Sequence, residues 1–78
     1  MEKELTLGEK RVGSTFNPSE NMTVAETKKN YAAEIDRLEG LRMTITGERA
    51  SQERQRTLSM AQTHAEMACM LAVKCIFQ

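Results

Sequence analysis

Apolar side chains follow a helical period over residues 23–41 and again over residues 48–77. In the first segment, the apolar positions that recur at intervals of three, four or seven residues are Val24, Tyr31, Ile35 and Leu38. This spacing places them on one face of a helix. Thr23 and Glu26 have the spacing of a capping box, in which a hydroxyl and a carboxylate satisfy backbone N–H groups at a helix start. The pattern predicts a first helix over about residues 23–41 that begins at Thr23.

Residues 48–77 contain neither glycine nor proline and consist mostly of good helix formers, which predicts a second, longer helix. Two apolar stripes run along it. One contains Met60, Met67, Met70 and Phe77, and the other contains Leu58, Ala61, Ala65, Ala68, Ala72 and Ile76. A helix that is apolar on two sides needs two neighbours, and a hairpin supplies only one. We therefore expect the remaining stripe to be covered by another copy of the chain.

The other segments predict less regular structure. Residues 1–20 carry two glycines and the turn-like sequence Asn17-Pro18-Ser19, in which the proline disfavours helix at the preceding residue. Residues 42–47 contain three consecutive β-branched residues, which suit a connection better than a helix centre. The sequence thus predicts an all-α fold. An irregular N-terminal arm (1–20) precedes an antiparallel two-helix hairpin (21–78), which assembles into a homo-oligomeric helical bundle.

Composition and charge narrow the range of partners. Eleven basic and eleven acidic residues give a net charge of zero, which argues against duplex DNA, because binding such a polyanion needs a basic excess. No run of about 18 apolar residues is present to span a membrane, and residues 1–8 lack the apolar core of a signal peptide. We expect a cytoplasmic protein that binds neither DNA nor membrane. A small anion held by a few cationic groups stays open as a ligand.

Side chains that support catalysis or metal binding are sparse. His64 has no histidine or cysteine at ligand spacing on its helix face, and no CxxC pair suggests zinc. Cys69 and Cys75 point to different faces of the predicted helix and cannot form a disulfide with each other. No serine lies in a nucleophile motif, and no glycine-rich phosphate loop occurs. We expect neither an enzyme nor a bound cofactor or metal.

One polar pattern on the second helix points to anion binding. Arg49, Arg56 and Thr63 stand at seven-residue steps, and therefore on about the same face, with Ser59 beside them. A guanidinium and a hydroxyl together offer several donors to a phosphate, and packing about a symmetry axis would repeat the set. A solvated helix start, with Glu48 and Glu53 neutralising the arginines, is the simpler interpretation of the spacing alone.

Two sets of residues, one in each half of the chain, have a distinctive order and spacing. In the arm and first helix they are Arg11-Val12, Phe16-Asn17-Pro18-Ser19, Val24, Lys28 and Ile35-Asp36. In the second helix they are Arg56, Ser59, Ala61, Thr63, Glu66, Ala68, Met70 and Ala72-Val73-Lys74. Over residues 11–77 the chain resembles the phage anti-CBASS cyclic-nucleotide sponges, whose helical hairpin is shared with sponges against the Thoeris system.

This resemblance implies a binding protein that acts in the cytoplasm of an infected bacterium. Members of the family sequester the cyclic oligonucleotides that bacterial immune enzymes make as alarm signals, so that downstream effectors stay silent. They are helical homo-oligomers, hexameric in the known type. Cyclic dinucleotides bind between protomers, in pockets formed partly by the arm and first helix. Cyclic trinucleotides bind separately, where second helices converge.

The resemblance also implies the site residues. By position, Lys28 becomes the phosphate contact of the dinucleotide pocket. The family stacks an aromatic ring of the arm on a base, and in this chain that role falls to Phe16, because Ser14 and Thr15 precede it; Asn17 is a candidate for a further donor. Thr63 becomes the trinucleotide contact. The arginine closest to it on the same face is Arg56, and Ser59 stands one turn before Thr63.

The alternative is a non-enzymatic helical adaptor or structural phage protein. Such a protein would bind a protein partner through its methionine-rich helix. It predicts that charge-preserving changes at Lys28 or Thr63 have no effect, whereas changes at Met67 or Met70 abolish function.

Overall fold

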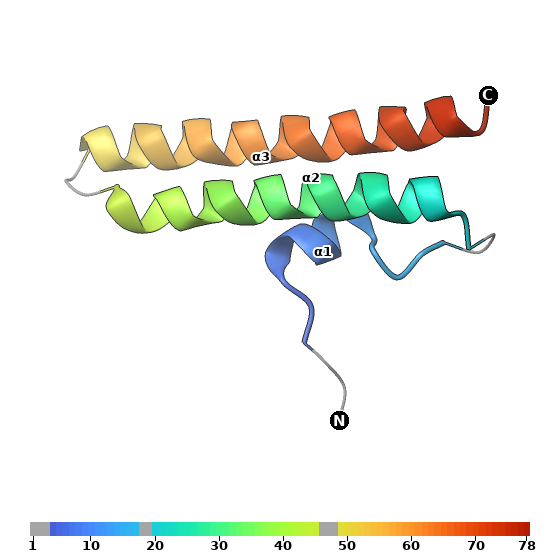
Figure 1. Ribbon diagram of the computed structural model, residues 1–78. Helices are drawn as coiled ribbons and strands as arrows, with labels where there is room; N and C mark the ends of the chain where they lie inside the picture. The colour runs from blue at the N-terminus through green and yellow to red at the C-terminus, as the bar shows by residue number, and fades with distance from the viewer. Residues whose placement is uncertain (1–3, 18–19, 46–48) are drawn as a thin grey trace.

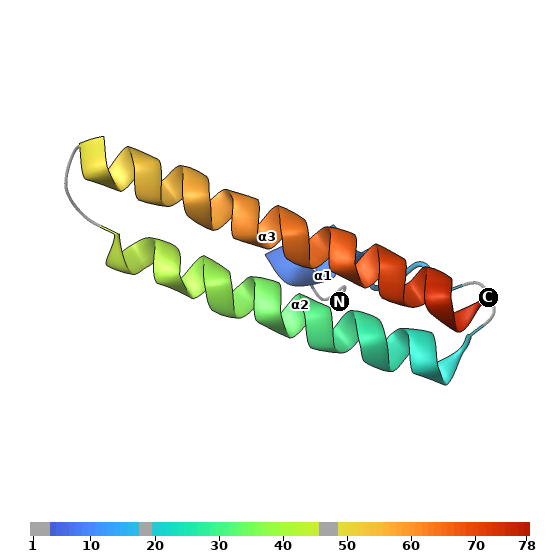
Figure 2. The same ribbon diagram turned by 90° about the horizontal axis from the view of Figure 1, so that it is seen from above.

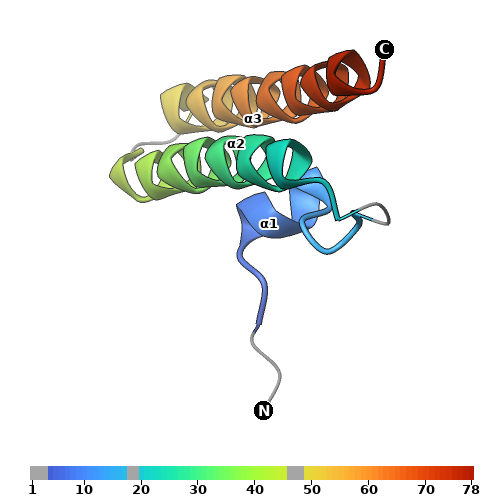
Figure 3. The ribbon, with the colours of Figure 1, turned by 45° about the vertical axis from the view of Figure 1, so that its right-hand side comes forward.

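The computed structural model describes residues 4–17, 20–45 and 49–78. It contains four helical elements, α1 (Leu7–Val12), α2 (Met22–Leu41), the short 3-10 helix η1 (Arg42–Thr44) and α3 (Arg49–Ile76). Within the described ranges there is no strand, so the prediction of an all-α fold is confirmed. α2 and α3 lie side by side, and the chain runs along them in opposite directions (Figures 1 and 2). α1 is short and packs across α2 (Figure 3).

α2 begins at a different cap from the one predicted. Asn21 is the N-cap, and its side-chain oxygen accepts the N–H of Val24 at 3.0 Å. The amide side chain of Asn17 holds the backbone of Asn21 in place, since it donates to the Asn21 carbonyl at 2.9 Å and accepts the Asn21 N–H at 3.2 Å. Thr23 is therefore already inside the helix, and the capping box predicted there is wrong. An asparagine caps as well as a hydroxyl residue, and here it is also anchored by its neighbour.

The C-terminal ends of the two long helices agree with the prediction to within a residue. α2 ends at Leu41, as expected, and α3 ends at Ile76, where an end at 77 was expected. The connection starts with the 3-10 helix η1, in which the Thr44 hydroxyl donates to the Leu41 carbonyl at 2.6 Å. The rest of the predicted connection, at 46–47, and the predicted start of the second helix at 48 lie outside the described residues.

The N-terminal arm is not irregular throughout, which corrects the prediction for residues 7–12. The capping box that forms in this chain is that of Thr6 and Glu9, where each side chain accepts the backbone N–H of the other. Gly13 ends α1 with φ +64°, a left-handed conformation that glycine adopts without strain. The Thr-x-x-Glu signal was present in the sequence. Two glycines close by made a helix of six residues hard to foresee.

The buried apolar core is small. It consists of Val24, Ala32, Ile35, Leu58 and Cys69. The predicted stripe of α2 supplies two of these, while Tyr31 and Leu38 are half-buried. The radius of gyration is 14.4 Å, whereas a compact domain of this length has roughly 11.5 Å. The chain therefore folds into an elongated body with little interior.

The methionine stripe of α3 is largely exposed. Its large apolar side chains, together with Leu71, are each at least 49% exposed: Met60, Met67, Met70, Leu71 and Phe77. In the other stripe Leu58 is buried and most of the alanines are half-buried. One stripe of α3 thus packs within the chain and the other faces outward.

Candidate ligand-binding site

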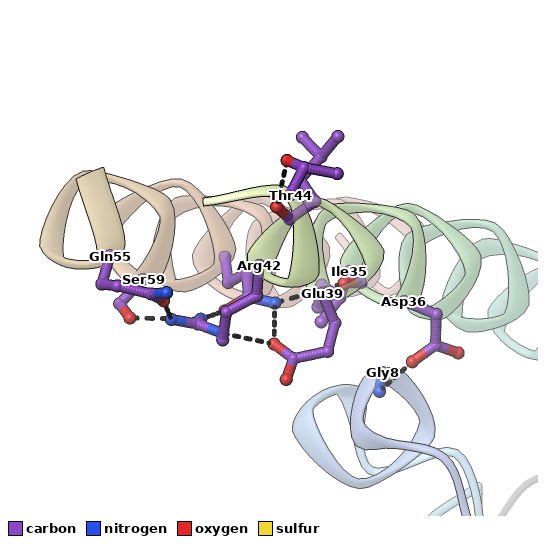
Figure 4. A network of polar contacts seen from close by, with 10 residues as sticks. Gly8, Ile35, Asp36, Glu39, Arg42, Thr44, Gln55 and Ser59 are labelled. Carbon is purple, nitrogen blue, oxygen red and sulfur yellow. Dashed lines mark hydrogen bonds and ion pairs between the residues drawn. The ribbon is translucent and has the colours of Figure 1, made fainter. Parts of the chain in front are cut away.

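The arm docks on α2 through a glycine contact. The backbone of Gly8 lies so close to Ala32 that a Cβ atom added at Gly8 would overlap the Ala32 carbonyl group. The N–H of Gly8 donates to the carboxylate of Asp36 at 2.7 Å, as Figure 4 shows. On the far side of the arm, Arg11 reaches Glu66 of α3 at 3.8 Å. These contacts fix α1 across the middle of α2.

The arm is fastened a second time by Lys28, one helical turn before Ala32. The Lys28 ammonium donates to the carbonyl of Gly13 at 2.9 Å and to the carbonyl of Phe16. The Gly13 carbonyl also accepts the N–H of Phe16 at 2.9 Å, which closes a turn. Both ends of this turn therefore meet on one ammonium. The ammonium also lies 5.6 Å from the centre of the Phe16 ring, within reach of a cation–π interaction.

Lys28 is buried and lacks a counter-ion in the described part of the chain. The residue is only 8% exposed. The ion pairs found within 4.0 Å join other residues, and none includes Lys28. Carbonyl dipoles and an aromatic face stabilise the charge without neutralising it. A buried charge is costly unless it is paired, so this position favours an anion.

A pocket of about 280 Å³ lies between the arm and α2, and Lys28 lines it. The arm contributes Thr6, Glu9 and Ser14, and α2 contributes Ala25, Lys28, Lys29, Ala32, Ala33 and Asp36. Two lysines thus share the wall with two carboxylates. One of these carboxylates, Asp36, already accepts a backbone N–H from α1. Two hydroxyls add further hydrogen-bonding capacity for a polar ligand.

Of the predicted dinucleotide contacts, Lys28 alone lines this pocket. Phe16 is 71% exposed and stands beside the ammonium on the outside. The amide of Asn17 is engaged with the backbone of Asn21 in both directions. Asn17 therefore has a structural role at the start of α2, and its role as a ligand donor stays a prediction.

The predicted trinucleotide contacts on α3 stand apart from the pocket. Arg56 donates to Glu53 at 3.2 Å, and both side chains are well exposed. This is the neutralised, solvated arrangement that the spacing alone favoured. Ser59 accepts a hydrogen bond from Arg42 at 3.3 Å, and Thr63 is exposed. The side chain of Arg49 lies outside the described residues.

Sequence reasoning missed Arg42, which joins α2 to α3 (Figure 4). Its guanidinium donates to Glu39 at 3.0 Å, to Gln55 at 2.6 Å, to Ser59 at 3.3 Å and to Gln62 at 2.7 Å. Gln62, only 3% exposed, donates in turn to Glu39 at 3.0 Å and to the Ile35 carbonyl at 3.3 Å. We call Glu39, Arg42, Gln55, Ser59 and Gln62 the polar seam. The spacing of its three α3 residues, which places them on one helix face, was the available signal.

Two side chains have perturbed pKa values because of these surroundings. Hydrogen bonds from Gln62 and then Arg42 lower the pKa of Glu39 below its ordinary 4.5, since both favour the ionised form. Burial raises the pKa of the Cys69 thiol above its ordinary 9.0, and the nearby charge of Lys28 opposes this rise. Glu39 is thus ionised at neutral pH, whereas Cys69 stays a protonated, apolar side chain.

A second hollow, of about 520 Å³, lies between the end of α2 and the first half of α3. Its apolar lining comes mainly from Leu38, Leu41, Ile45, Leu58 and Ala61. In the described ranges, no group of three histidine, cysteine or acidic side chains gathers as a metal site would require. No helix of that part is long and apolar enough to cross a bilayer.

Comparisons with protein-family models, with curated proteins and with solved structures gave no match.

Proposed function

We propose that this protein binds and sequesters cyclic di- or trinucleotide messengers of bacterial CBASS defence without cleaving them, as a phage-encoded immune-evasion protein. The observation that carries the proposal is the buried ammonium of Lys28, which lines the pocket between the arm and α2 and has no counter-ion within residues 4–17, 20–45 and 49–78. The bridging phosphate of a cyclic nucleotide supplies the missing negative charge. The resemblance of residues 11–77 to the sponge family supports the choice of this anion over others.

The surroundings of Lys28 suit a nucleotide. Lys29 lines the same pocket and adds a second cation, and the hydroxyls of Thr6 and Ser14 are positioned to bond phosphate or sugar oxygens. The exposed ring of Phe16 stands 5.6 Å from the Lys28 ammonium. A base can stack on the free face of this ring while its phosphate points toward the lysine. Proteins that bind nucleotides without sequence preference use the same arrangement.

Assembly of several copies belongs to the proposal. The chain exposes 6105 Å², whereas a compact monomer of 8.8 kDa exposes roughly 4800 Å². Contact between copies through the methionine stripe of α3 would remove part of this excess. Arg56 and Thr63 lie on the same outward side as Met60 and Met67, so converging α3 helices bring several such pairs together. We propose a hexamer of α2–α3 hairpins, with trinucleotides bound where these helices meet.

The test is a calorimetric titration of the full-length protein with a panel of cyclic di- and trinucleotides. Light scattering on the same sample gives the mass of the assembly. We expect saturable binding by an oligomer, recovery of intact nucleotide after heat denaturation, and loss of dinucleotide binding in Lys28→Gln. The matched control is Lys29→Gln, which removes a charge from the same pocket but no contact with the arm. Absence of binding across the whole panel would overturn the proposal, and a cleaved product would reassign the protein as a nuclease.

A helical adaptor is the second candidate, and the exposure of the methionine stripe favours it. Met67 and Met70 are 54% and 66% exposed, and methionine surfaces adapt to varied partners. Under this alternative, Met67→Gln and Met70→Gln abolish capture of a host protein while the purified chain binds no nucleotide. Under the sponge proposal the same changes weaken the assembly, and capture of a host protein is not expected.

A further inference from the structure

The arm forms one wall of the pocket, so the pocket exists only while the arm is closed on α2. Thr6, Glu9 and Ser14 come from the arm, and the other lining residues come from α2. A ligand in this pocket therefore touches both parts. The contacts that hold the arm closed therefore also determine the fraction of molecules in which the pocket is formed.

α1 packs closely against α2, and a small set of polar contacts adds to this packing in the described part of the chain. The Arg11–Glu66 pair is long, at 3.8 Å, and its side chains are 45% and 30% exposed, so its contribution is small. Gly8 and its bond to Asp36 fix the helix α1. The turn that follows is fastened to α2 by the ammonium of Lys28, which bonds its first and last carbonyl groups. Hydrogen bonds to charged groups are stronger than neutral ones, so Lys28 is the main fastening of this turn.

We propose that Lys28 is the latch of the arm and that ligand binding strengthens the latch. A lysine ammonium has three N–H donors, and the turn uses two of them. The third donor and the unneutralised charge remain for a phosphate. Arm and anion therefore bind the same ammonium together and do not compete for it. The part of this inference that concerns nucleotides rests on the proposed function, whereas the latch itself does not.

The consequence is reciprocal coupling. If closure of the arm favours the ligand, the ligand must favour closure by the same factor. The pocket should bind weakly in any variant whose arm is open, including variants altered at residues that touch no ligand. Gly8 offers such a position, because it does not line the pocket and any side chain there collides with Ala32.

The latch is tested first without ligand, by NMR-detected amide hydrogen exchange on the full chain. The reporters are the N–H groups of Gly13, Ser14 and Phe16, which donate to carbonyls within the arm. We expect Lys28→Met to speed their exchange by about ten- to a hundredfold, the effect of losing a charged hydrogen bond. Lys29→Met is the matched control and should leave them unchanged. Equal exchange in wild type and Lys28→Met would overturn the latch. If Lys28→Met loses its helical circular dichroism, Lys28→Gln replaces it.

The coupling is tested next by titrating Gly8→Ala with the cyclic dinucleotide that binds the wild-type protein most tightly. We expect faster arm exchange without ligand and an affinity lower by about tenfold or more. An open arm with wild-type affinity would overturn the coupling and leave the latch intact. If no cyclic nucleotide binds the wild type, the proposed function fails, while the ligand-free exchange experiment still decides whether Lys28 is the latch.

Discussion

Lys28 and Arg42 are both cations of the α2 region, the first buried and the second partly exposed, and their surroundings differ. Arg42 bonds a carboxylate, two amides and a hydroxyl, so its charge is neutralised within the polar seam. Lys28 bonds two backbone carbonyls and faces an aromatic ring, which leaves its charge without a counter-ion among the described residues. Both side chains donate hydrogen bonds within the chain, but only the charge of Arg42 is neutralised there.

This difference separates a structural cation from a candidate binding cation. A neutralised guanidinium with all its partners inside the chain stabilises the contact between two helices and has little left for a ligand. An ammonium that is bonded but not neutralised still attracts an anion. Hydrogen-bond satisfaction alone is therefore a poor guide to function, and the balance of formal charge around a buried group is a better one.

The strongest test of the comparison is ligand affinity. We expect Lys28→Gln to weaken dinucleotide binding by about a hundredfold, or ~3 kcal/mol, because a charge-assisted contact to phosphate is lost. Arg42→Gln should change the affinity by less than about threefold, since Glu39 already neutralises the charge of Arg42 within the polar seam. Calorimetry on folded samples gives both numbers. Equal losses in the two variants would mean that charge balance does not distinguish these cations.

For the free energy of unfolding, in contrast to ligand affinity, we expect the change at Arg42 to have the larger effect. Arg42→Met leaves the buried side chain of Gln62 without one of its partners, so we expect the free energy of unfolding to fall by about 2 kcal/mol. The control is Arg56→Met, whose exposed pair with Glu53 should contribute less than about 0.5 kcal/mol. Urea denaturation at equal protomer concentration measures both, because self-association makes stability depend on concentration. Equal losses of unfolding free energy in Arg42→Met and Arg56→Met would mean that the polar seam is dispensable for stability.

Acid should weaken the seam without acting directly on the latch. The pKa of Glu39 is lowered in the folded state, chiefly by Gln62 and then by Arg42. Its stabilising effect is therefore fully present above the ordinary value of 4.5 and is lost as the pH falls through the lowered folded value. The effect is modest because the side chain is 42% exposed. We expect Glu39→Gln to flatten the fall in melting temperature below pH 4.5, and an unchanged slope would contradict the assignment.

The smallest expected effect is on cysteine reactivity, which reports on the C-terminal part of α3. Cys69 is 2% exposed, and burial raises the pKa of its thiol, so little thiolate is available. Cys75 is exposed. Iodoacetamide at pH 8 should therefore modify Cys75 well before Cys69, as mass spectrometry of timed samples would show. Similar rates at both cysteines would mean that this end of the helix pair opens readily.

The long helices could be predicted because their signals are local. Apolar spacing located α2 and α3, and the end of α2 at Leu41 followed from the β-branched residues after it. The start of α2 was missed because its cap, Asn21, is held by the side chain of Asn17 four residues earlier. α1 was missed because much of what holds this short helix is contact with α2 at Gly8, which no local pattern reveals.

The candidate site was predictable only in part. The resemblance singled out Lys28, yet nothing in the sequence showed that its ammonium would bond the Gly13–Phe16 turn. Asn17 was chosen as a donor, and the fold uses its amide at the start of α2, whereas Ser59 accepts a hydrogen bond from Arg42. Arg42 was overlooked because its partners come from α3, thirteen to twenty residues further along the chain. Tertiary contacts of this kind decide which polar groups remain free.

The short sequence separation across the polar seam also has a kinetic consequence. The contacts of Arg42 with α3 close loops of thirteen to twenty residues, and those of Lys28 with the arm close loops of twelve and fifteen. Loops of this size cost little entropy to close, and chains dominated by such contacts fold within microseconds to milliseconds. Each chain is thus expected to be folded before it meets another copy. The encounter between copies, which depends on concentration, would then set how quickly an assembly appears.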